Sequence, residues 1–220
     1  MSENSILIVS GGSIEDVFVL ELLDKNNYGT VIACDSAIEF FRKNGRLPDL
    51  VLGDFDSAGR DTVEFFREQA DVCFEQFSAE KDWTDTELAV RRALLFGPSR
   101  IDLAGATGGN RIDHMLGNIQ LLALALAEGV RMFLLDAHNR IRLLTPGSYT
   151  VTKDGQYGDF ISLLPFGGTA YGVTLRGMKY PLNEATLTED ITLGISNQIA
   201  DETAELSFSE GKILMIETRD

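Results

Sequence analysis

Residues 30–57 read TVIACDSAIEFFRKNGRLPDLVLGDFDS, and they predict a strand, a helix and a second strand in succession. Residues 30–34 and 50–52 are short aliphatic runs, whereas residues 36–43 carry apolar side chains at the three- and four-residue spacing of a helix. A unit of this kind predicts two parallel strands joined by a crossover helix. Both predicted strands run directly into acidic residues, so the same stretch also bears on function.

The alternation of strand and helix continues to about residue 137. Strands are predicted at residues 6–9, 71–74, 101–104 and 132–135, and helices at about 13–24, 60–69, 84–96 and 119–128. Ser13 is the expected cap of the first helix, and residues 84–87, Thr-Asp-Thr-Glu, form a capping box for the fourth. This order predicts an α/β domain with a doubly wound, mostly parallel sheet.

The pattern changes in the last third of the chain. Aliphatic runs at residues 141–144, 160–164 and 213–216 are separated by turn formers such as Pro146-Gly147 and Gly167-Gly168, and no helical period is present. This part predicts a small antiparallel β-sandwich. We therefore expect an α/β domain over residues 1–138 and an all-β domain over residues 139–220.

Composition restricts the class of protein. The 220 residues are 44% hydrophobic, which indicates a folded globular chain, and the net charge of −15 makes nucleic acid an unsuitable partner. Neither a signal peptide nor an apolar run long enough for a membrane span is recognisable. Cys34 and Cys73 lie in strand-like runs, so we expect both to be reduced, buried residues of a cytoplasmic protein.

Acidic residues follow most of the predicted parallel strands. In an open α/β sheet, ligands bind outside the carboxyl ends of the strands, where Asp35, Asp54, Asp56, Asp85 and Asp136 would meet. Crowded carboxylates repel one another unless a cation is bound or some are protonated. Carboxylate oxygen suits hard cations, so the pattern favours Mg²⁺. A turn-forming Asp54–Asp56 pair is the alternative.

The loop at residues 105–109, Gly-Ala-Thr-Gly-Gly, offers bare backbone amides ahead of a predicted helix, and such amides can hold an anion. Arg111 could bind phosphate or pair with Asp113, and His114 could relay a proton or cap the helix. The residues alone thus predict a Mg²⁺-dependent enzyme that acts on a phosphorylated ligand such as a nucleotide.

Four stretches, in this order, resemble the thiamine pyrophosphokinase family. Leu47-Pro48-Asp49 leads into GDFDS at residues 53–57, and the others are KDWTDTELA at residues 81–89, residues 105–119, and Ser196-Asn197 followed by a hairpin to residue 212. The resemblance implies a Mg²⁺-dependent enzyme that transfers a pyrophosphoryl group from ATP to the thiamine hydroxyl and releases AMP. It also implies a homodimer of two-domain subunits, with thiamine bound between the subunits.

The resemblance also implies roles for individual residues. The metal ligands would be Asp54, Asp56 and Asp85, the residues on the ATP side would be Asp35, Asp82, Thr84, Arg111 and His114, and the residues that contact thiamine would be Ser196 and Asn197. Asp113 matches the same nucleotide-side motif as Arg111 and His114, and it is our own candidate for a general base. Residues 36–39 and an extra Asn110 depart from the family pattern, which affects the placement of Arg111.

Two other classes of function fit the bare residues. A Mg²⁺-dependent phosphohydrolase would use water in place of thiamine, and a non-catalytic sensor would keep the fold without needing all three metal ligands. An NAD-binding protein is disfavoured, because neither glycine-rich loop has the Gly-x-Gly-x-x-Gly pattern.

Overall fold

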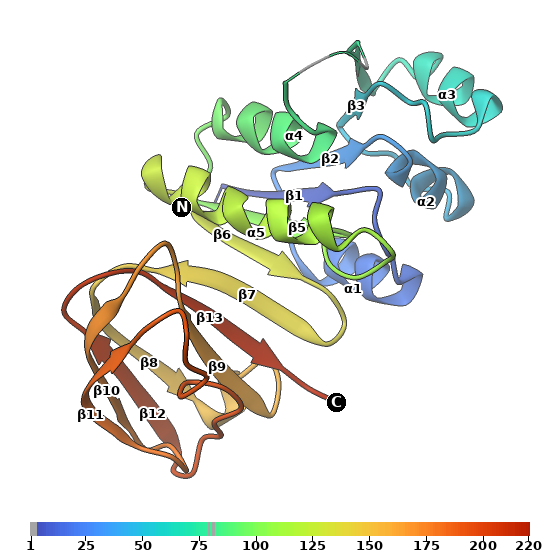
Figure 1. The fold of residues 1–220 in the computed structure, drawn as a ribbon. Coiled ribbons are helices and arrows are strands. Elements are labelled where there is room, and N and C mark those ends of the chain that lie inside the picture. The colour runs from blue at the N-terminus through green and yellow to red at the C-terminus, as the bar shows by residue number, and fades with distance from the viewer. Residues whose placement is uncertain (1–3, 79, 81) are drawn as a thin grey trace. The chain divides into compact units, whose positions relative to one another are not determined.

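The computed structural model describes residues 4–78, 80 and 82–220, and the chain divides into two compact units, Met1–Ala137 and His138–Asp220. This division lies one residue from the boundary expected between the α/β and all-β parts. Figure 1 labels the helices and strands.

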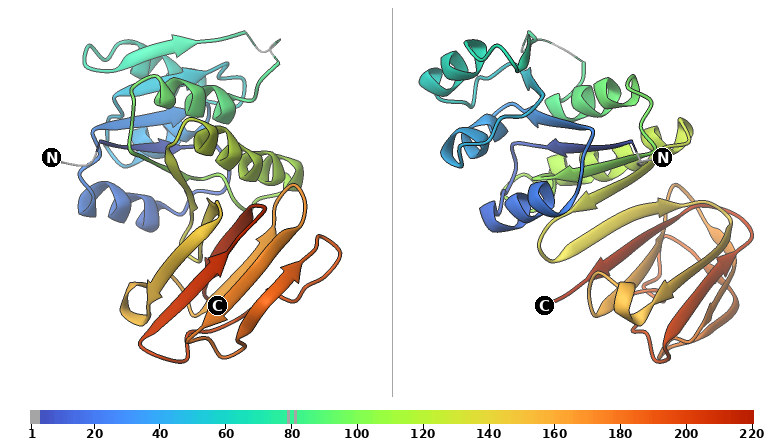
Figure 2. Two further views of the ribbon diagram at one scale, coloured as in Figure 1. Left: turned by 90° about the vertical axis from the view of Figure 1, so that its left-hand side faces the viewer. Right: turned by 180° about the vertical axis from the view of Figure 1, so that it is seen from behind.

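The first unit contains a parallel six-stranded sheet in the order β4-β3-β2-β1-β5-β6, as predicted. The chain moves outward from β1 to β4, then α4 returns it across the sheet to β5 on the other side of β1. The first three helices cover one face, and α4 and α5 cover the other (Figures 1 and 2). Its elements are β1 (Ser5–Val9), α1 (Asp16–Lys25), β2 (Thr30–Cys34), α2 (Ala37–Lys43), β3 (Leu50–Gly53), α3 (Arg60–Arg67), β4 (Cys73–Gln76), α4 (Asp85–Leu94), β5 (Arg100–Ala104), α5 (Ile112–Ala127) and β6 (Arg131–Leu135).

Both faces of the central strands are buried, which explains why β1, β2 and β3 are mostly aliphatic. Residues Ile6, Leu7, Ile8 and Val9 of β1 are fully buried, and Phe41 and Phe66 bring α2 and α3 into the core. The return of the chain to the far side of β1 makes the gap between β1 and β5 the topological switch point, where this class of sheet binds ligands.

Three local predictions in this unit are wrong. Helix α1 begins at Asp16 after Glu15, not at a Ser13 cap, and α5 begins at Ile112, seven residues before the predicted start at 119. Cys34 is buried as expected, but Cys73 is exposed. Cys73 begins β4, which has a neighbour on one side only within this parallel sheet and is less covered than the central strands.

The second unit is a pair of antiparallel sheets, with strand orders β7-β13-β9 and β11-β10-β12-β8, which confirms the β-sandwich prediction. The strands that follow and precede Gly211 belong to different sheets, so the predicted hairpin ending at residue 212 is wrong. The elements are β7 (Asn139–Leu144), β8 (Gly147–Thr152), the short 3-10 helix η1 (Lys153–Gly155), β9 (Phe160–Pro165), β10 (Ala170–Arg176), β11 (Leu182–Leu187), β12 (Thr203–Phe208) and β13 (Ile213–Thr218).

A single apolar core is shared by the two sheets of this unit. Ile213 and Met215 of β13 are buried with Leu206 and Phe208 of β12, because alternate residues of each strand point inward. The helices of the described residues are all too short or too polar to cross a bilayer.

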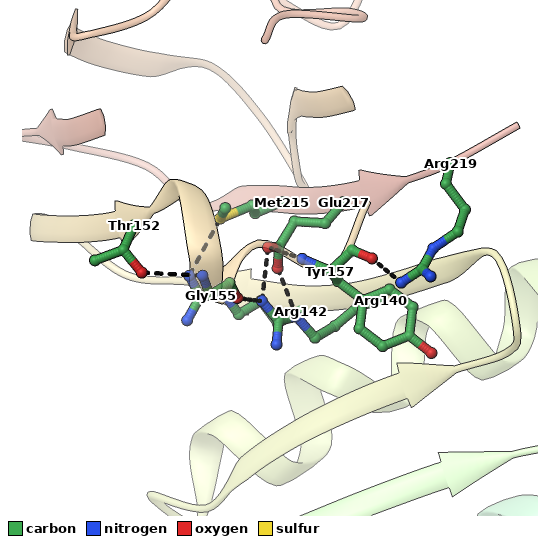
Figure 3. A network of polar contacts seen from close by, with 8 residues as sticks. All are labelled: Arg140, Arg142, Thr152, Gly155, Tyr157, Met215, Glu217 and Arg219. Carbon is green, nitrogen blue, oxygen red and sulfur yellow. Dashed lines mark hydrogen bonds and ion pairs between the residues drawn. The ribbon is translucent and has the colours of Figure 1, made fainter. Parts of the chain in front are cut away.

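One buried ion pair joins β7 to β13 (Figure 3). Arg140 lies directly opposite Glu217 and donates to both of its carboxylate oxygens, at 2.6 Å each. The Glu217 side chain is fully buried, and the backbone N–H of Tyr157 donates to it at 3.2 Å. Arg219 donates to the Tyr157 carbonyl, which fixes the same loop from its other side.

Candidate active site

A cleft of about 700 Å³ opens in the first unit, where the loops after β1, β2, β3 and β5 meet the start of α4. We call it the first cleft. This is the edge at which the polar loops were predicted to gather. Its lining residues are Ser10, Gly11, Gly12, Ser13, Cys34, Asp35, Ser36, Asp54, Ser57, Trp83, Thr84, Asp85, Thr86, Gly105, Ala106, Gly108, Gly109, Asn110, Arg111, His114, Met115 and Asn118.

Glycines let the loops after β1 and β5 touch. Gly105 has a φ of 65°, and a Cβ there would lie 2.3 Å from the carbonyl oxygen of Ser10. The N–H of Gly12 donates to the Gly105 carbonyl at 2.9 Å, which locks the contact. Gly108 and Gly109 also have positive φ, of 73° and 77°, in the approach to α5. The predicted glycine loop thus lines the cleft with backbone rather than side chains.

Three carboxylates converge at the ends of β2 and β3, and two of them, Asp35 and Asp54, line the first cleft. Asp35 follows β2, Asp54 and Asp56 follow β3, and one oxygen from each lies within 4.8 Å of the others. Asp35 Oδ1 is buried without a hydrogen-bond partner. Burial, and then the charges of Asp85, Asp54 and Asp56, raise the pKa of the Asp35 carboxyl, although the Ser36 N–H acts in the opposite direction. One oxygen of Asp35 is therefore buried beside two further carboxylates without a hydrogen-bond partner.

The backbone between the two β3 carboxylates is unusual. Phe55 has a φ of 61°, a conformation that bulky residues rarely adopt, and its side chain is buried and stacked on Phe74 with ring centroids 4.9 Å apart. The anchored ring turns the chain, so that the N–H of Asp56 donates to Asp54 Oδ1 at 3.1 Å. Packing of one aromatic residue thus holds the two carboxylates together.

The start of α4 forms the wall that faces these carboxylates. Thr84 caps the helix by accepting a hydrogen bond from the Glu87 N–H at 3.1 Å, which confirms half of the predicted capping box. Thr86 shares a buried hydrogen bond of 2.6 Å with Ser10 at the end of β1. Asp85, between the two threonines, is therefore held in the cleft, near enough to raise the pKa of Asp35.

The Arg111, Asp113 and His114 group lies at the start of α5. Arg111 donates to both oxygens of Asp113, with its closest contact at 2.7 Å, and this interaction lowers the pKa of Asp113. Arg111 lines the first cleft, and Asp113 lines a second cleft of about 420 Å³ between α4 and α5. His114 lines both. The role of Asp113 as general base stays a prediction.

Comparisons with known proteins decide the family. Residues 21–134 match the family model for the thiamin pyrophosphokinase catalytic domain, and residues 148–213 match that for its vitamin B1 binding domain. Thiamine pyrophosphokinase of Bacillus subtilis is 38% identical over 192 residues, which cover 87% of this chain and 85% of that protein. The chain belongs to the thiamine pyrophosphokinase family.

Solved structures of this family share the fold. The crystal structure of the Bacillus subtilis thiamine pyrophosphokinase superposes with a TM-score of 0.86 at 34% identity, covering 99% of this chain and all of that one. The enzyme from Geobacillus thermodenitrificans gives a TM-score of 0.83 at 33% identity, with 98% of each chain covered. The fold expected from the resemblance is confirmed.

Ser196 and Asn197 lie in the part of the chain that matches the family's vitamin B1 binding domain. Asn197 is buried, and its side chain accepts from the N–H of Tyr180 at 3.0 Å and donates to the Tyr180 carbonyl at 2.7 Å. Ser196 has a φ of 56°, and its N–H donates to Ser162. The Asn197 amide thus positions this loop, while its predicted contact with thiamine stays a prediction.

Not every predicted residue of the family's ATP side lies in the first cleft. Asp82 is exposed and is absent from its lining, and Lys81 lies outside the described residues. Asp136 accepts a 2.5 Å hydrogen bond from Thr107 of the glycine loop, so it supports that loop.

Sequence reasoning placed Asp35 at the same sheet edge as the β3 carboxylates, because each acidic residue directly follows a predicted strand. It missed the bond between Ser10 and Thr86. No local signal indicates that bond, because it joins residues 76 positions apart.

Proposed function

We propose that this chain transfers a pyrophosphoryl group from ATP to the hydroxyl of thiamine, using Mg²⁺ held by carboxylates in the first cleft. The reaction follows from membership of the family, whereas the metal and the residues assigned to it are our proposal. The observation that carries the proposal is the convergence of Asp35, Asp54 and Asp56, with one oxygen of Asp35 buried and without a hydrogen-bond partner.

The donor set fits Mg²⁺. Among the described residues, the three converging groups are all carboxylates, and hard divalent cations prefer oxygen ligands. Crowded acids that repel one another are stabilised when a cation neutralises them. We assign the metal to Asp54 and Asp56, with Asp85 as predicted from the family and Asp35 added because it shares their position. When bound, Mg²⁺ would neutralise charge on the transferred phosphates.

The chain's own residues would orient the substrates. Backbone amides of residues 105–109 and the guanidinium of Arg111 are suited to phosphate oxygens, and Asp113 holds that guanidinium in place. The thiamine hydroxyl would form a bond to the β-phosphorus while the bond to the AMP oxygen breaks. Holding the reacting groups in line supplies much of the rate in such transfers.

Product analysis tests the reaction. We expect AMP to appear from ATP only when thiamine is present, in equal amount to thiamine diphosphate. AMP or ADP released at the same rate without thiamine would instead indicate the phosphohydrolase alternative, because water would then be the acceptor. Nucleotide binding with no product under any condition would indicate the sensor.

Removal of divalent cation should abolish ATP binding and affect thiamine binding much less. ATP brings about four negative charges to a cleft that already holds several carboxylates, and each uncompensated pair at ~4–6 Å is repulsive by a few kcal/mol at an effective dielectric near 20. Thiamine is a cation, which the net charge of −15 attracts. Calorimetric titration of each ligand, with Mg²⁺ and with chelator, measures the difference. Equal ATP affinity in chelator would contradict the metal assignment.

We further propose that the active form is a homodimer whose thiamine sites take residues from both subunits. The carboxylates lie in the match to the catalytic domain, and Ser196 and Asn197 lie in the separate match to the vitamin B1 binding domain. Thiamine would then need both parts, supplied by different chains.

Mixing two inactive variants tests the shared site. Asp54→Asn removes a proposed metal ligand and Ser196→Trp fills the proposed thiamine side, so each homodimer should be inactive. In a hybrid dimer one site carries both changes and the other carries neither, and we expect up to about half of the parental activity per hybrid. A monomer in sedimentation at assay concentration, or no recovery after proven subunit exchange, would contradict the proposal.

We also propose that the protein works in the cytoplasm. Cys34 and Cys73 are both free thiols, as is usual in a reducing compartment. Fractionation of cells followed by thiamine-dependent AMP release in each fraction would test the location.

A further inference from the structure

Trp83 is an exposed aromatic residue in the wall of the first cleft. It directly precedes the Thr84 cap of α4, and 47% of its surface is accessible although the indole is a large apolar group. Nothing in the fold requires an exposed tryptophan at a helix start. A flat apolar face in a cleft of polar loops is typical of a surface that packs against a ligand ring.

One face of this indole is already covered by a cation. The guanidinium carbon of Arg91 lies 4.7 Å from the centroid of the Trp83 ring. Arg91 is held there by Glu87, one helical turn earlier, at 2.8 Å. Arg91 lines the second cleft and Trp83 lines the first, so the ring stands between the two. The ion pair fixes the guanidinium, and the guanidinium restricts rotation of the indole.

Because Arg91 covers one face of the Trp83 indole, the other face favours some ligand rings over others. A cation draws on the negative charge of an aromatic face, so a second cation on the opposite face meets a weakened attraction and a like charge. Thiamine is cationic, whereas the base of ATP is neutral and flat. The arrangement therefore favours the nucleobase over thiamine.

We propose that Trp83, held by Arg91, is the stacking platform for the adenine base of ATP in the first cleft. This inference rests on the proposed function, since it presumes that ATP binds in that cleft. Trp83 would recognise the adenine base of ATP. The carboxylates, the glycine loop and Arg111 cannot recognise the base, because those groups act on phosphate. A triphosphate without a base would lose this contact and keep the others.

Fluorescence reports on the proposal directly, because Trp83 is the only tryptophan in the chain. Addition of ATP with Mg²⁺, without thiamine, should quench its emission in a saturable way with the same Kd as calorimetry gives. Inorganic tripolyphosphate with Mg²⁺ should bind in calorimetry but leave the emission within a few per cent of the free protein. Thiamine alone should also leave it unchanged.

Substitution of the ring separates stacking from folding. Trp83→Leu should raise the Kd of ATP by about 10- to 100-fold, in line with the loss of one base–aromatic stack. It should change the Kd of tripolyphosphate less than twofold, and Trp83→Phe should recover most of the ATP affinity. Phe96→Leu is the matched control, because Phe96 is also exposed, also lies under an arginine, and does not line the first cleft. It should bind ATP as the parent does.

Four results would overturn the proposal. ATP that binds and supports thiamine-dependent AMP release without quenching would leave the proposed function intact and remove the platform. An equal loss of ATP and tripolyphosphate binding in Trp83→Leu would show that the ring only supports the loop, and a raised KM for thiamine alone would assign the ring to thiamine. Failure of the parent protein to bind ATP with Mg²⁺ would remove both the proposed function and the platform.

Discussion

Replacement of Asp56 by asparagine is expected to lower the rate of thiamine diphosphate formation by about a thousandfold, since it removes electrostatic stabilisation at the reacting phosphates. Asparagine keeps the shape of the side chain and removes the negative charge that a hard cation requires. The Asp56 side chain is exposed and contributes nothing to the apolar core, and it accepts a hydrogen bond from the Ser57 hydroxyl at 2.7 Å. The fold should therefore be unchanged, which circular dichroism and thermal unfolding would show.

Asp61→Asn provides the matched control for this experiment. Asp61 is also an exposed aspartate in the same unit, in the first turn of α3, but it does not belong to the carboxylate group. Its replacement should leave the rate within about twofold, because a surface charge away from the site interacts weakly in water. Asp56→Asn that retains near-parental activity in saturating Mg²⁺ would contradict the metal assignment.

Asp35→Asn distinguishes the two sets of proposed ligands. The family pattern predicts Asp54, Asp56 and Asp85, whereas the structure groups Asp35 with Asp54 and Asp56. If Asp35 helps to hold the metal, its asparagine variant should weaken Mg²⁺-dependent ATP binding as much as Asp56→Asn does. A loss in Asp85→Asn alone would favour the set predicted from the family.

Replacement of Glu217 by glutamine should destabilise the second unit by about 3 kcal/mol, because it leaves the Arg140 charge without its buried partner. Both carboxylate oxygens of Glu217 are used by Arg140, and the Tyr157 N–H adds a third bond. For a chain of this size we expect the Tm to fall by roughly 6–12 °C. Differential scanning calorimetry of the parent and the variant measures the change.

Two further variants test whether the loss of stability comes from the buried charge that is left without a partner. Glu21→Gln breaks an exposed pair with Lys25 in α1 and should cost less than about 1 kcal/mol. Arg140→Met combined with Glu217→Met removes both charges and should be more stable than Glu217→Gln, since no ion is left buried alone. A Tm for Glu217→Gln within 2 °C of the parent would mean that water replaces the lost partner.

Local sequence pattern was sufficient to predict the central strands, whose residues are almost all buried. The predicted strand at residues 30–34 is β2 (Thr30–Cys34), and the other central strands are within one residue, because most positions in a two-sided sheet are aliphatic. Prediction was weaker at the edge of the sheet, where the strand expected at 71–74 is β4 (Cys73–Gln76). The first turns of α5 were missed because the exposed Asp113, His114 and Gly117 interrupt the apolar period there.

Local sequence pattern was enough to predict a parallel sheet with acidic and glycine-rich loops at one of its edges. These properties depend on period, turn residues and the positions of polar groups after each strand, which are local in the chain. It also determined the family, through motifs that occur in order along the chain.

Long-range packing, in contrast, determines which of those polar groups meet. Asp35 joins Asp54 and Asp56 because β2 pairs with β3 in a register that places Cys34 beside Leu52. Arg140 meets Glu217, 77 residues away, because β7 and β13 are neighbours in one sheet. Strand order and register result from the free energy of packing distant segments together, and no local pattern in the chain carries that information.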